Sequence, residues 1–233
     1  MKIKSLDIII PCYNPIGNWT KNIIDSATAL NQQMDISFNY ILVNDGSTIT
    51  IKKEDIQLLK NKIDRFEYYS YDKNKGKGYA IRFGVQKSKH DNIVFTDIDF
   101  PYGTNAILEM VDALENGKDL VLALRNESYY NNISPSRKFI SKVLKFTIKL
   151  FFRIPISDTQ GGLKALSKKA KEHLLSTTID RYLFDLELVK LCSKDHLDII
   201  GIPCTLKPDI QLSSVGFSIL KNEFSNFVKL LKM

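Results

Sequence analysis

The sequence is poor in the residues that build disulfide frameworks and structural zinc sites. Its 233 residues include three cysteines, far apart and odd in number, and three histidines, with no Cys-x-x-Cys and no Cys/His cluster. Disulfide-rich secreted domains and zinc modules need such residues at close spacing. Both classes are therefore excluded, and a reduced, cytoplasmic compartment is expected.

Long apolar runs are missing as well. No segment approaches the roughly 18 consecutive apolar residues of a membrane-spanning helix, and the apolar stretch near the N-terminus is too short for a signal peptide. The formal net charge is +7, so an anionic partner is expected: nucleotide phosphate, nucleic acid or an acidic membrane surface. The charge alone does not choose among these partners.

The sequence does contain a regular alternation of apolar runs and helical stretches. Runs typical of buried parallel strands occur at 6–10, 40–43, 66–69, 93–96 and 120–124, with helical stretches between them at about 18–33, 52–62, 77–89 and 104–116. This βαβα order predicts an α/β fold with a mostly parallel sheet and helices on both faces. No linker divides the chain, so a single domain over 1–233 is expected.

Beyond residue 125 the alternation ends. The sequence there predicts a long basic helix at about 135–153, a helix around 181–192, a strand near 197–203 and a C-terminal helix near 217–231. No strand is predicted between residues 126 and 196.

Polar, turn-forming segments follow the first four predicted strands: PCYNP (11–15), NDGST (44–48), DKNKGKGYAIR (72–82) and TDIDFPYG (96–103). Ligands of such sheets bind beyond the carboxyl ends of the strands, so these segments are expected to carry the chemistry. Cations and glycines at a helix N-terminus, as in 75–78, suit an anionic diphosphate. A solvated lysine turn is the alternative.

Asp97 and Asp99 form a D-x-D pair directly after the fourth predicted strand. In an extended chain the two side chains point to one face, and two such carboxylates repel each other unless a cation or hydrogen-bond donors neutralise them. Mg²⁺ or Mn²⁺, bound together with substrate phosphates, meets that need. Solvated aspartates that cap the following helix are the alternative, and the pair alone leaves both interpretations open.

Six segments in order carry a family resemblance: DIIIPCYN, VNDGST, KGKGYAIR, FTDIDFPYG, SDTQGGLKAL and YLFDLEL. Together they resemble the family 2 glycosyltransferases of GT-A fold, and more closely the group of dolichyl-phosphate glucosyl- and mannosyltransferases. The resemblance covers about residues 5–190. It implies a GT-A, Rossmann-like fold, with 1–125 as the nucleotide-sugar-binding half and 126–233 as the acceptor- and membrane-facing half.

The resemblance implies a donor site at the ends of the first strands. Asp45 is expected to accept a hydrogen bond from a uracil or guanine N–H, Asp99 to bind Mg²⁺ or Mn²⁺, and Asp97 to contact a sugar or ribose hydroxyl. Asn44 and Pro15 stand where the family has acidic residues, which leaves the donor nucleotide open. The implied nucleotide-sugar-binding residues are Pro11, Tyr13, Asn14, Asp45, Lys77, Arg82 and Asp97.

On the acceptor side, Arg125 and Arg137 match arginines that surround the acceptor phosphate in the lipid-phosphate branch of the family. Bidentate arginine suits a phosphate, and surface arginines are the alternative. Asp158 and Gln160 belong to the D-T-Q segment, which closes over the acceptor side in that family and which implies acceptor contacts for both.

Asp185 and Glu187 form a second acidic pair, in a predicted helix. Residues two apart on a helix point about 200° away from each other, so only one of them can face the site. Asp185 is favoured for an acceptor or base role, and a salt-bridged helix face is the alternative. The implied catalytic residues are Asp97, Asp99, Asp185 and Gln160.

The stretch 137–154 contains no acidic residue, and five of its six cations fall within a stripe about 80° wide on a helix. Apolar residues spread over the opposite side. Such a basic amphipathic helix suits the interface of an anionic membrane. A helix packed on the domain with a solvated lysine face is the alternative.

The resemblance as a whole implies an inverting, metal-dependent hexosyltransferase. Its donor would be a UDP- or GDP-hexose, with UDP-glucose favoured, and its acceptor a polyprenyl phosphate reached peripherally at the inner face of the membrane. The alternatives are transfer to a saccharide hydroxyl in cell-surface polysaccharide synthesis, or a non-catalytic nucleotide-sugar-binding module. Nucleic-acid binding is not expected, because the charge is concentrated on one amphipathic helix, and homo-oligomerisation is left open.

Overall fold

The computed structural model describes residues 2–126, 158–208 and 217–232, together with eight residues between 129 and 156 (Tyr129, Lys138, Ser141, Lys142, Lys145, Thr147, Ile148 and Ile156). The predicted basic helix at 135–153 therefore lies mostly outside the described residues, and Arg137 lies outside them too. Predictions that depend on these parts stay predictions.

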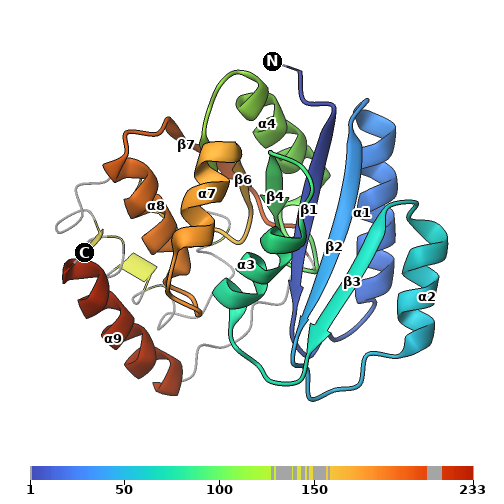
Figure 1. Ribbon diagram of the computed structural model, residues 1–233, viewed down its shortest axis with the longest axis horizontal. Coiled ribbons are helices and arrows are strands. Elements are labelled where there is room, and N and C mark those ends of the chain that lie inside the picture. Colours follow the sequence, from blue (N-terminus) through green and yellow to red (C-terminus); the bar gives the residue numbers. More distant parts are fainter. Residues whose placement is uncertain are drawn as a thin grey trace.

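A seven-stranded sheet is formed by the described residues, in the order β3-β2-β1-β4-β6-β5-β7 (Figure 1). Within it, β6 runs antiparallel to its neighbours β4 and β5, and the other neighbouring pairs are parallel. The prediction of a mostly parallel α/β sheet is confirmed. The strands are β1 (Ser5–Cys12), β2 (Ser37–Asp45), β3 (Phe66–Tyr71), β4 (Ile93–Phe95), β5 (Leu120–Arg125), β6 (Lys164–Leu166) and β7 (Ile199–Cys204).

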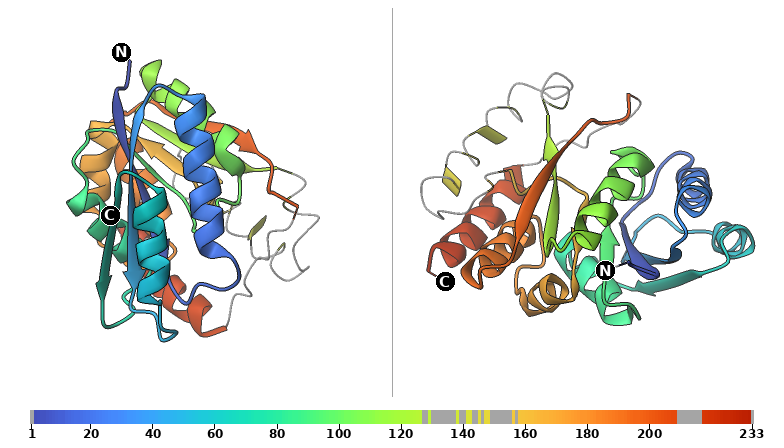
Figure 2. Two further views of the ribbon diagram at one scale, coloured as in Figure 1. Left: turned by 90° about the vertical axis from the view of Figure 1, so that its right-hand side faces the viewer. Right: turned by 90° about the horizontal axis from the view of Figure 1, so that it is seen from above.

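Helices cover both faces of the sheet, as Figure 2 shows from two further sides. On one face α1 (Trp19–Gln33), α2 (Lys53–Lys62) and α4 (Gly103–Glu115) share a core with Ile8 and Ile10 of β1. On the other, α3 (Lys77–Lys87), α7 (Lys168–Ser176) and α8 (Phe184–Lys194) pack with Ile9. Because successive residues of a strand point to opposite faces, the apolar run of β1 serves both layers.

Two elements are not predicted from the sequence. Strand β6 has three residues, too few for any periodicity, and it exists because β4 and β5 pair with it on both sides. Helix α7 follows directly, and its first turn is capped by the hydroxyl of Ser167, which accepts from the N–H of Ala170. Between residues 126 and 196 the sequence analysis thus missed one strand and one helix.

The remaining elements of the second half agree with prediction within a few residues. Helix α8 begins at Phe184 rather than near 181, β7 covers the predicted strand, and α9 (Phe217–Lys232) is the predicted C-terminal helix. Within the described residues, no helix combines the length and the apolar character needed to cross a bilayer.

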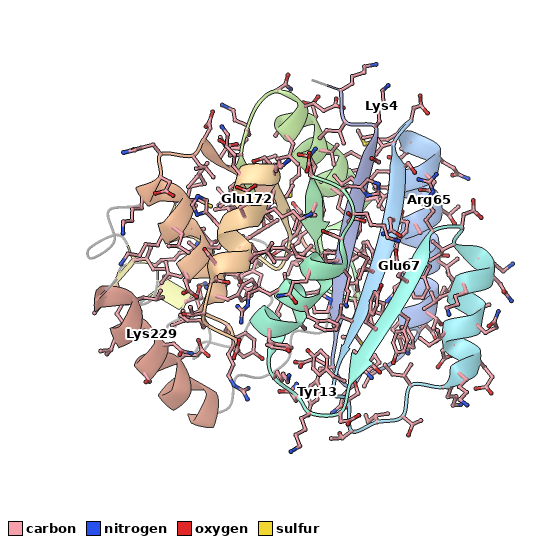
Figure 3. The ribbon with its side chains drawn as sticks, in the orientation of Figure 1. Lys4, Tyr13, Arg65, Glu67, Glu172 and Lys229 are labelled. Atoms are coloured by element: carbon pink, nitrogen blue, oxygen red, sulfur yellow. The ribbon has the colours of Figure 1, made fainter. Side chains whose placement is uncertain are left out.

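The direction of the strands gathers the predicted segments at one edge of the sheet. Strands β1, β2 and β3 end at the lower edge in Figure 1, and Tyr13, just after β1, lies there in Figure 3. The antiparallel β6 begins at this same edge, because its first residue, Lys164, pairs with Phe95 at the end of β4. The 158–163 segment is thereby brought next to the D-x-D pair.

Candidate functional site

Asn14 joins the loops that follow β1 and β2. Its backbone is left-handed (φ 46°), a conformation that asparagine tolerates better than most residues. Its side-chain oxygen accepts from the N–H groups of Thr48 (2.8 Å) and Ile49 (3.0 Å), and its own N–H donates to the Ser47 hydroxyl (2.8 Å). Tyr13, beside it, is 49% exposed. The two loops thus form one rigid rim.

Asp45 is buried at the end of β2 and holds the loop between β3 and α3. Its carboxylate accepts from the Tyr71 hydroxyl (2.8 Å), the Asn74 amide (2.8 Å) and the backbone N–H groups of Lys75 (2.8 Å) and Gly76 (3.0 Å). A carboxylate offers about four lone-pair sites, so these donors saturate it. The predicted contact of Asp45 with a nucleobase would require one of them to leave.

Lys77 and Asp97 form an ion pair at the mouth of the site, with 2.5 Å between Nζ and Oδ1. Burial would lower the pKa of Lys77, but the charges of Asp97 and Asp185 outweigh it and raise that pKa. The other carboxylate oxygen of Asp97 faces Gly162, where an added Cβ would lie only 2.1 Å away. Lys77 thus holds one oxygen of Asp97, and the other oxygen lies close to Gly162.

Asp99 is in a different environment. It is partly buried, and among the described residues it forms no ion pair. Burial, and after it the charge of Asp97, raises the pKa of Asp99 above its ordinary value. A cation beside this carboxylate would relieve both effects.

Asp99 fits a metal ion that is bound partly by the protein and partly by a ligand. In the described part of the chain, no group of three or more His, Cys, Asp or Glu side chains could hold a metal ion alone. Mg²⁺ commonly takes one or two carboxylates from the protein and completes its shell with phosphate oxygens and water. Asp99 therefore suits such an ion when a diphosphate is present.

A second ion pair lies behind the first. Lys164 of β6 is 0% exposed, and its Nζ lies 2.6 Å from the Asp185 carboxylate and 2.7 Å from the carbonyl oxygen of Gly161. Burial raises the pKa of Asp185 and lowers that of Lys164, while their mutual attraction opposes both shifts. Asp185 is thus one half of a buried ion pair, and its charge also acts on Lys77.

Glu187 points elsewhere. Its carboxylate accepts from the backbone N–H groups of Thr178 (2.9 Å) and Ile179 (2.8 Å), in the loop before α8. The geometry agrees with the expectation that only one member of this acidic pair can face the site.

Arg125 and Asp158 come together at the end of β5. Two guanidinium nitrogens of Arg125 lie 2.5 and 2.9 Å from one carboxylate oxygen of Asp158, and Lys145 lies 2.7 Å from the other. Burial would raise the pKa of Asp158, but the two cations outweigh it and lower that pKa. The three side chains carry a net charge of +1 beside the predicted acceptor segment.

Arg82, on α3, is bound to the loop at 177–180. Its guanidinium donates to the hydroxyl of Thr177 (3.0 Å) and the carbonyl of Ile179 (2.7 Å), and it pairs with Asp180. It therefore fixes the 177–180 loop. Gln160 is partly buried, and its amide donates to the Thr159 hydroxyl (3.3 Å).

Three residues of the site are not among the site residues expected from the sequence. Lys164 and Gly162 contact the acidic residues, and Lys145 contacts Asp158. A lone lysine inside the apolar run of GLKAL was a usable signal, because a lysine in a buried strand needs an acidic partner. No comparable sequence pattern marks Gly162 or Lys145.

Comparison with known proteins fits this fold and this site. The model of the family described as glycosyl transferase family 2 matches residues 7–175, and the chain belongs to that family. Its seven-stranded sheet with helices on both faces is the GT-A fold of these enzymes.

Two relatives are dolichyl-phosphate beta-glucosyltransferases. The one from Saccharomyces cerevisiae is 23% identical over 218 residues, which cover 85% of this chain and 65% of that protein. The one from Mus musculus is 27% identical over 205 residues, covering 80% and 62%. The chain thus spans less than two thirds of the length of these relatives.

Solved structures share the fold at lower identity. Glucosyl-3-phosphoglycerate synthase from Mycobacterium tuberculosis, solved with Mn²⁺, UDP and its product, superposes with a TM-score of 0.60 at 16% identity, covering 89% of this chain and 73% of that one. Mannosyl-3-phosphoglycerate synthase from Rubrobacter xylanophilus gives 0.65 at 13% identity, covering 98% and 73%.

Proposed function

We propose that this protein transfers a hexose from a nucleoside diphosphate to a polyprenyl phosphate, with Mg²⁺ or Mn²⁺ bound at Asp99. The observation that carries the proposal is the contrast within the D-x-D pair. Asp97 is fixed by Lys77, whereas Asp99 forms no ion pair among the described residues. One carboxylate is thus oriented toward a sugar or ribose hydroxyl, and the other is available to a cation.

The donor diphosphate would lie between Asp99 and the start of α3. A metal ion bound there would neutralise the negative charge that develops on the departing diphosphate. Lys77 adds a positive charge at the first residue of α3, where the helix dipole also favours anions. The rim built by Asn14, with the half-exposed Tyr13, would receive the nucleoside.

The acceptor phosphate needs no general base. Its second pKa is about 6, by analogy with phosphoserine, so it is largely dianionic at neutral pH. A phosphate oxygen attacks the anomeric carbon, the bond from that carbon to the donor diphosphate breaks, and the configuration inverts. The burial of Asp185 in an ion pair supports this route, since a carboxylate held by a lysine is a weaker base.

Cations at the end of β5 support an anionic acceptor. Arg125 and Lys145 both contact the carboxylate of Asp158. An incoming phosphate could take over part of the role of Asp158, because arginine binds phosphate and carboxylate in the same bidentate way. Arg137 is proposed to join them.

The finer assignments are also proposals. UDP-glucose is the favoured donor, since the two dolichyl-phosphate relatives are named as glucosyltransferases. Residues 1–125 would form the donor half and 126–233 the acceptor half of a single domain. The basic segment 135–153 would bring that second half peripherally to the inner face of an anionic membrane.

A donor screen tests the proposal. UDP-glucose, UDP-galactose and GDP-mannose are offered with polyprenyl phosphate, with an oligosaccharide, or with neither, each with Mn²⁺ or with a chelator. Release of nucleoside diphosphate is expected with one donor class, and only with both Mn²⁺ and the lipid phosphate. Release with the oligosaccharide instead would favour a hydroxyl acceptor, and binding without turnover on either acceptor would favour a non-catalytic module.

A further inference from the structure

Two lysines and two aspartates meet behind the mouth of the site. Lys77 of α3 pairs with Asp97, which follows β4, and Lys164 of β6 pairs with Asp185 of α8. The Asp185 charge also acts on Lys77, which joins the two pairs into one cluster. The cluster has two charges of each sign, and the buried Lys164–Asp185 pair is neutral by itself, which limits its desolvation cost.

Gly162 packs directly on this cluster. A Cβ at Gly162 would lie 2.1 Å from Oδ2 of Asp97 and 3.5 Å from Nζ of Lys77. Since Lys77 holds the other oxygen of Asp97, this carboxylate is confined from both sides. An alanine at position 162 would displace the end of a side chain, not the backbone.

The neighbouring Gly161 provides a contrast. A Cβ there would lie 2.1 Å from the backbone carbonyl oxygen of Ala123 in β5. Relief of that overlap requires the sheet itself to move. The two glycines therefore have different reasons to lack a side chain: Gly161 packs on backbone, and Gly162 packs on a carboxylate.

Lys164 fixes the place of Gly162. Its Nζ binds the carbonyl oxygen of Gly161, one residue before Gly162, and is itself held by Asp185. At 0% exposure Lys164 cannot touch a substrate. Its influence on Asp97 passes through the turn at 161–162.

We propose that Gly162 is a positioning residue for Asp97, held in place by the buried Lys164–Asp185 pair. The acceptor-side segment 158–162 thereby sets the orientation of a donor-side carboxylate, so donor affinity depends on residues that do not touch the donor. The inference rests on the proposed function in one respect, the assignment of Asp97 to the donor.

The test compares Gly162→Ala with Gly161→Ala. Binding of UDP-glucose and of GDP-mannose with Mn²⁺ is measured by calorimetry, together with thermal unfolding. Gly162→Ala is expected to unfold near the wild-type temperature. It is expected to bind the wild type's preferred donor about tenfold more weakly, because one charge-assisted hydrogen bond to that donor is lost. Gly161→Ala is expected to lose thermal stability instead.

Two results would overturn the proposal: wild-type donor affinity in Gly162→Ala, or a loss of stability as large as that of Gly161→Ala. If the wild type binds neither donor, the proposed function fails, and the crystal structure of Gly162→Ala decides the inference by itself. A displaced Asp97 with a broken Lys77 contact supports it, and an unmoved Asp97 refutes it.

A second pair of variants tests the role of Lys164. Lys164→Met alone leaves Asp185 buried without its lysine, so a loss of stability is expected. Lys164→Met with Asp185→Leu removes both charges and is expected to regain stability but not donor affinity, because the Gly161 carbonyl stays unanchored. Recovery of both properties in the double variant would show that the pair acts only on the fold.

Discussion

Asp97 and Asp99 are two residues apart, yet the protein surrounds them differently. Lys77 and Gly162 confine Asp97, whereas Asp99 is partly buried with a pKa raised by burial and by the Asp97 charge. A carboxylate that is costly to ionise without a counter-charge is suited to a cation. At the residue scale, the proposed division of roles follows from these two environments.

Replacing Asp99 tests the metal assignment. Asp99→Asn removes the charge but keeps the shape, and turnover is expected to fall at least about 100-fold, since a metal supplies several kcal/mol of charge stabilisation. Turnover measured against Mn²⁺ concentration should also require much more metal. Asp112→Asn, at an exposed carboxylate on α4, is the matched control. An unchanged Mn²⁺ dependence in Asp99→Asn would refute the assignment.

The Arg125–Asp158–Lys145 group predicts an acid-dependent loss of stability. The cations hold the pKa of Asp158 below its ordinary 3.8, so its carboxylate stabilises the folded state fully above that value. The contribution is lost as the pH falls through the lowered pKa of the folded state.

Urea unfolding of the wild type and Asp158→Asn, between about pH 6 and pH 3, measures this effect. At the upper end the variant should be less stable by about 3–5 kcal/mol, because it leaves buried cations without their carboxylate. The difference should shrink toward the acidic end. A difference that stays constant over this range would contradict the predicted linkage.

At the scale of elements, the loop between β3 and α3 depends on Asp45. Asp45→Asn should lose about 1.5–3 kcal/mol for each hydrogen bond to the charged group that it cannot replace. Tyr71→Phe removes one donor to the same carboxylate and should cost less. Urea unfolding measures both variants. A fully stable Asp45→Asn that has lost nucleotide binding would instead support direct contact with the base.

The elements could be predicted from the sequence where their signals are local. Strands β1 to β5 follow from apolar runs, and α1 to α4 follow from the stretches between them. Strand β6 could not be predicted, because three residues become a strand only through pairing with β4 and β5.

The positions of the site segments could be predicted from the sequence, but the contacts of their side chains could not. The segments that hold Asp45, Asp97 and Asp99 follow from the strand order. Their partners do not. Arg82 binds the 177–180 loop, and Asp45 binds the backbone N–H groups of Lys75 and Gly76. Both sets of contacts depend on three-dimensional packing.

Across the whole molecule, α9 lies beside α8 and reaches the loop before it (Figures 1 and 2). Glu223 accepts from the N–H of Leu183 (2.9 Å), and Lys229, labelled in Figure 3, donates to Thr178 (2.9 Å). Arg82 holds the same loop from α3. The last described helix is thus connected to Arg82 of α3 through the 177–183 loop.

Removing the α9 contacts should loosen that loop. Glu223→Ala with Lys229→Ala is expected to speed amide hydrogen exchange in residues 177–183, while the strands of the sheet keep their protection. Val228→Ser, at an exposed position of the same helix, is the control. Unchanged exchange in the loop would mean that α3 and α8 hold it without α9.

The predicted membrane contact is tested on two lysines of the basic segment. Lys138→Glu with Lys142→Glu should weaken binding to anionic vesicles by roughly 30-fold or more, since each lysine near such a surface contributes about 1 kcal/mol. Lys145 is left in place because it pairs with Asp158. Lys60→Glu with Lys62→Glu, on α2, makes the same change of charge elsewhere. Equal losses in both variants, measured by vesicle sedimentation, would argue against a local contact.

The central claim is hexosyl transfer to a lipid phosphate with a metal at Asp99. The most direct measurement incubates the full chain with UDP-glucose, polyprenyl phosphate and Mn²⁺, and analyses the lipid by mass spectrometry. The account predicts a lipid heavier by one hexose, formed by the wild type and not by Asp99→Asn or in the presence of a chelator. A hexosylated lipid formed equally well without metal, or no hexosylated lipid with UDP-glucose or any other nucleotide hexose, would contradict it.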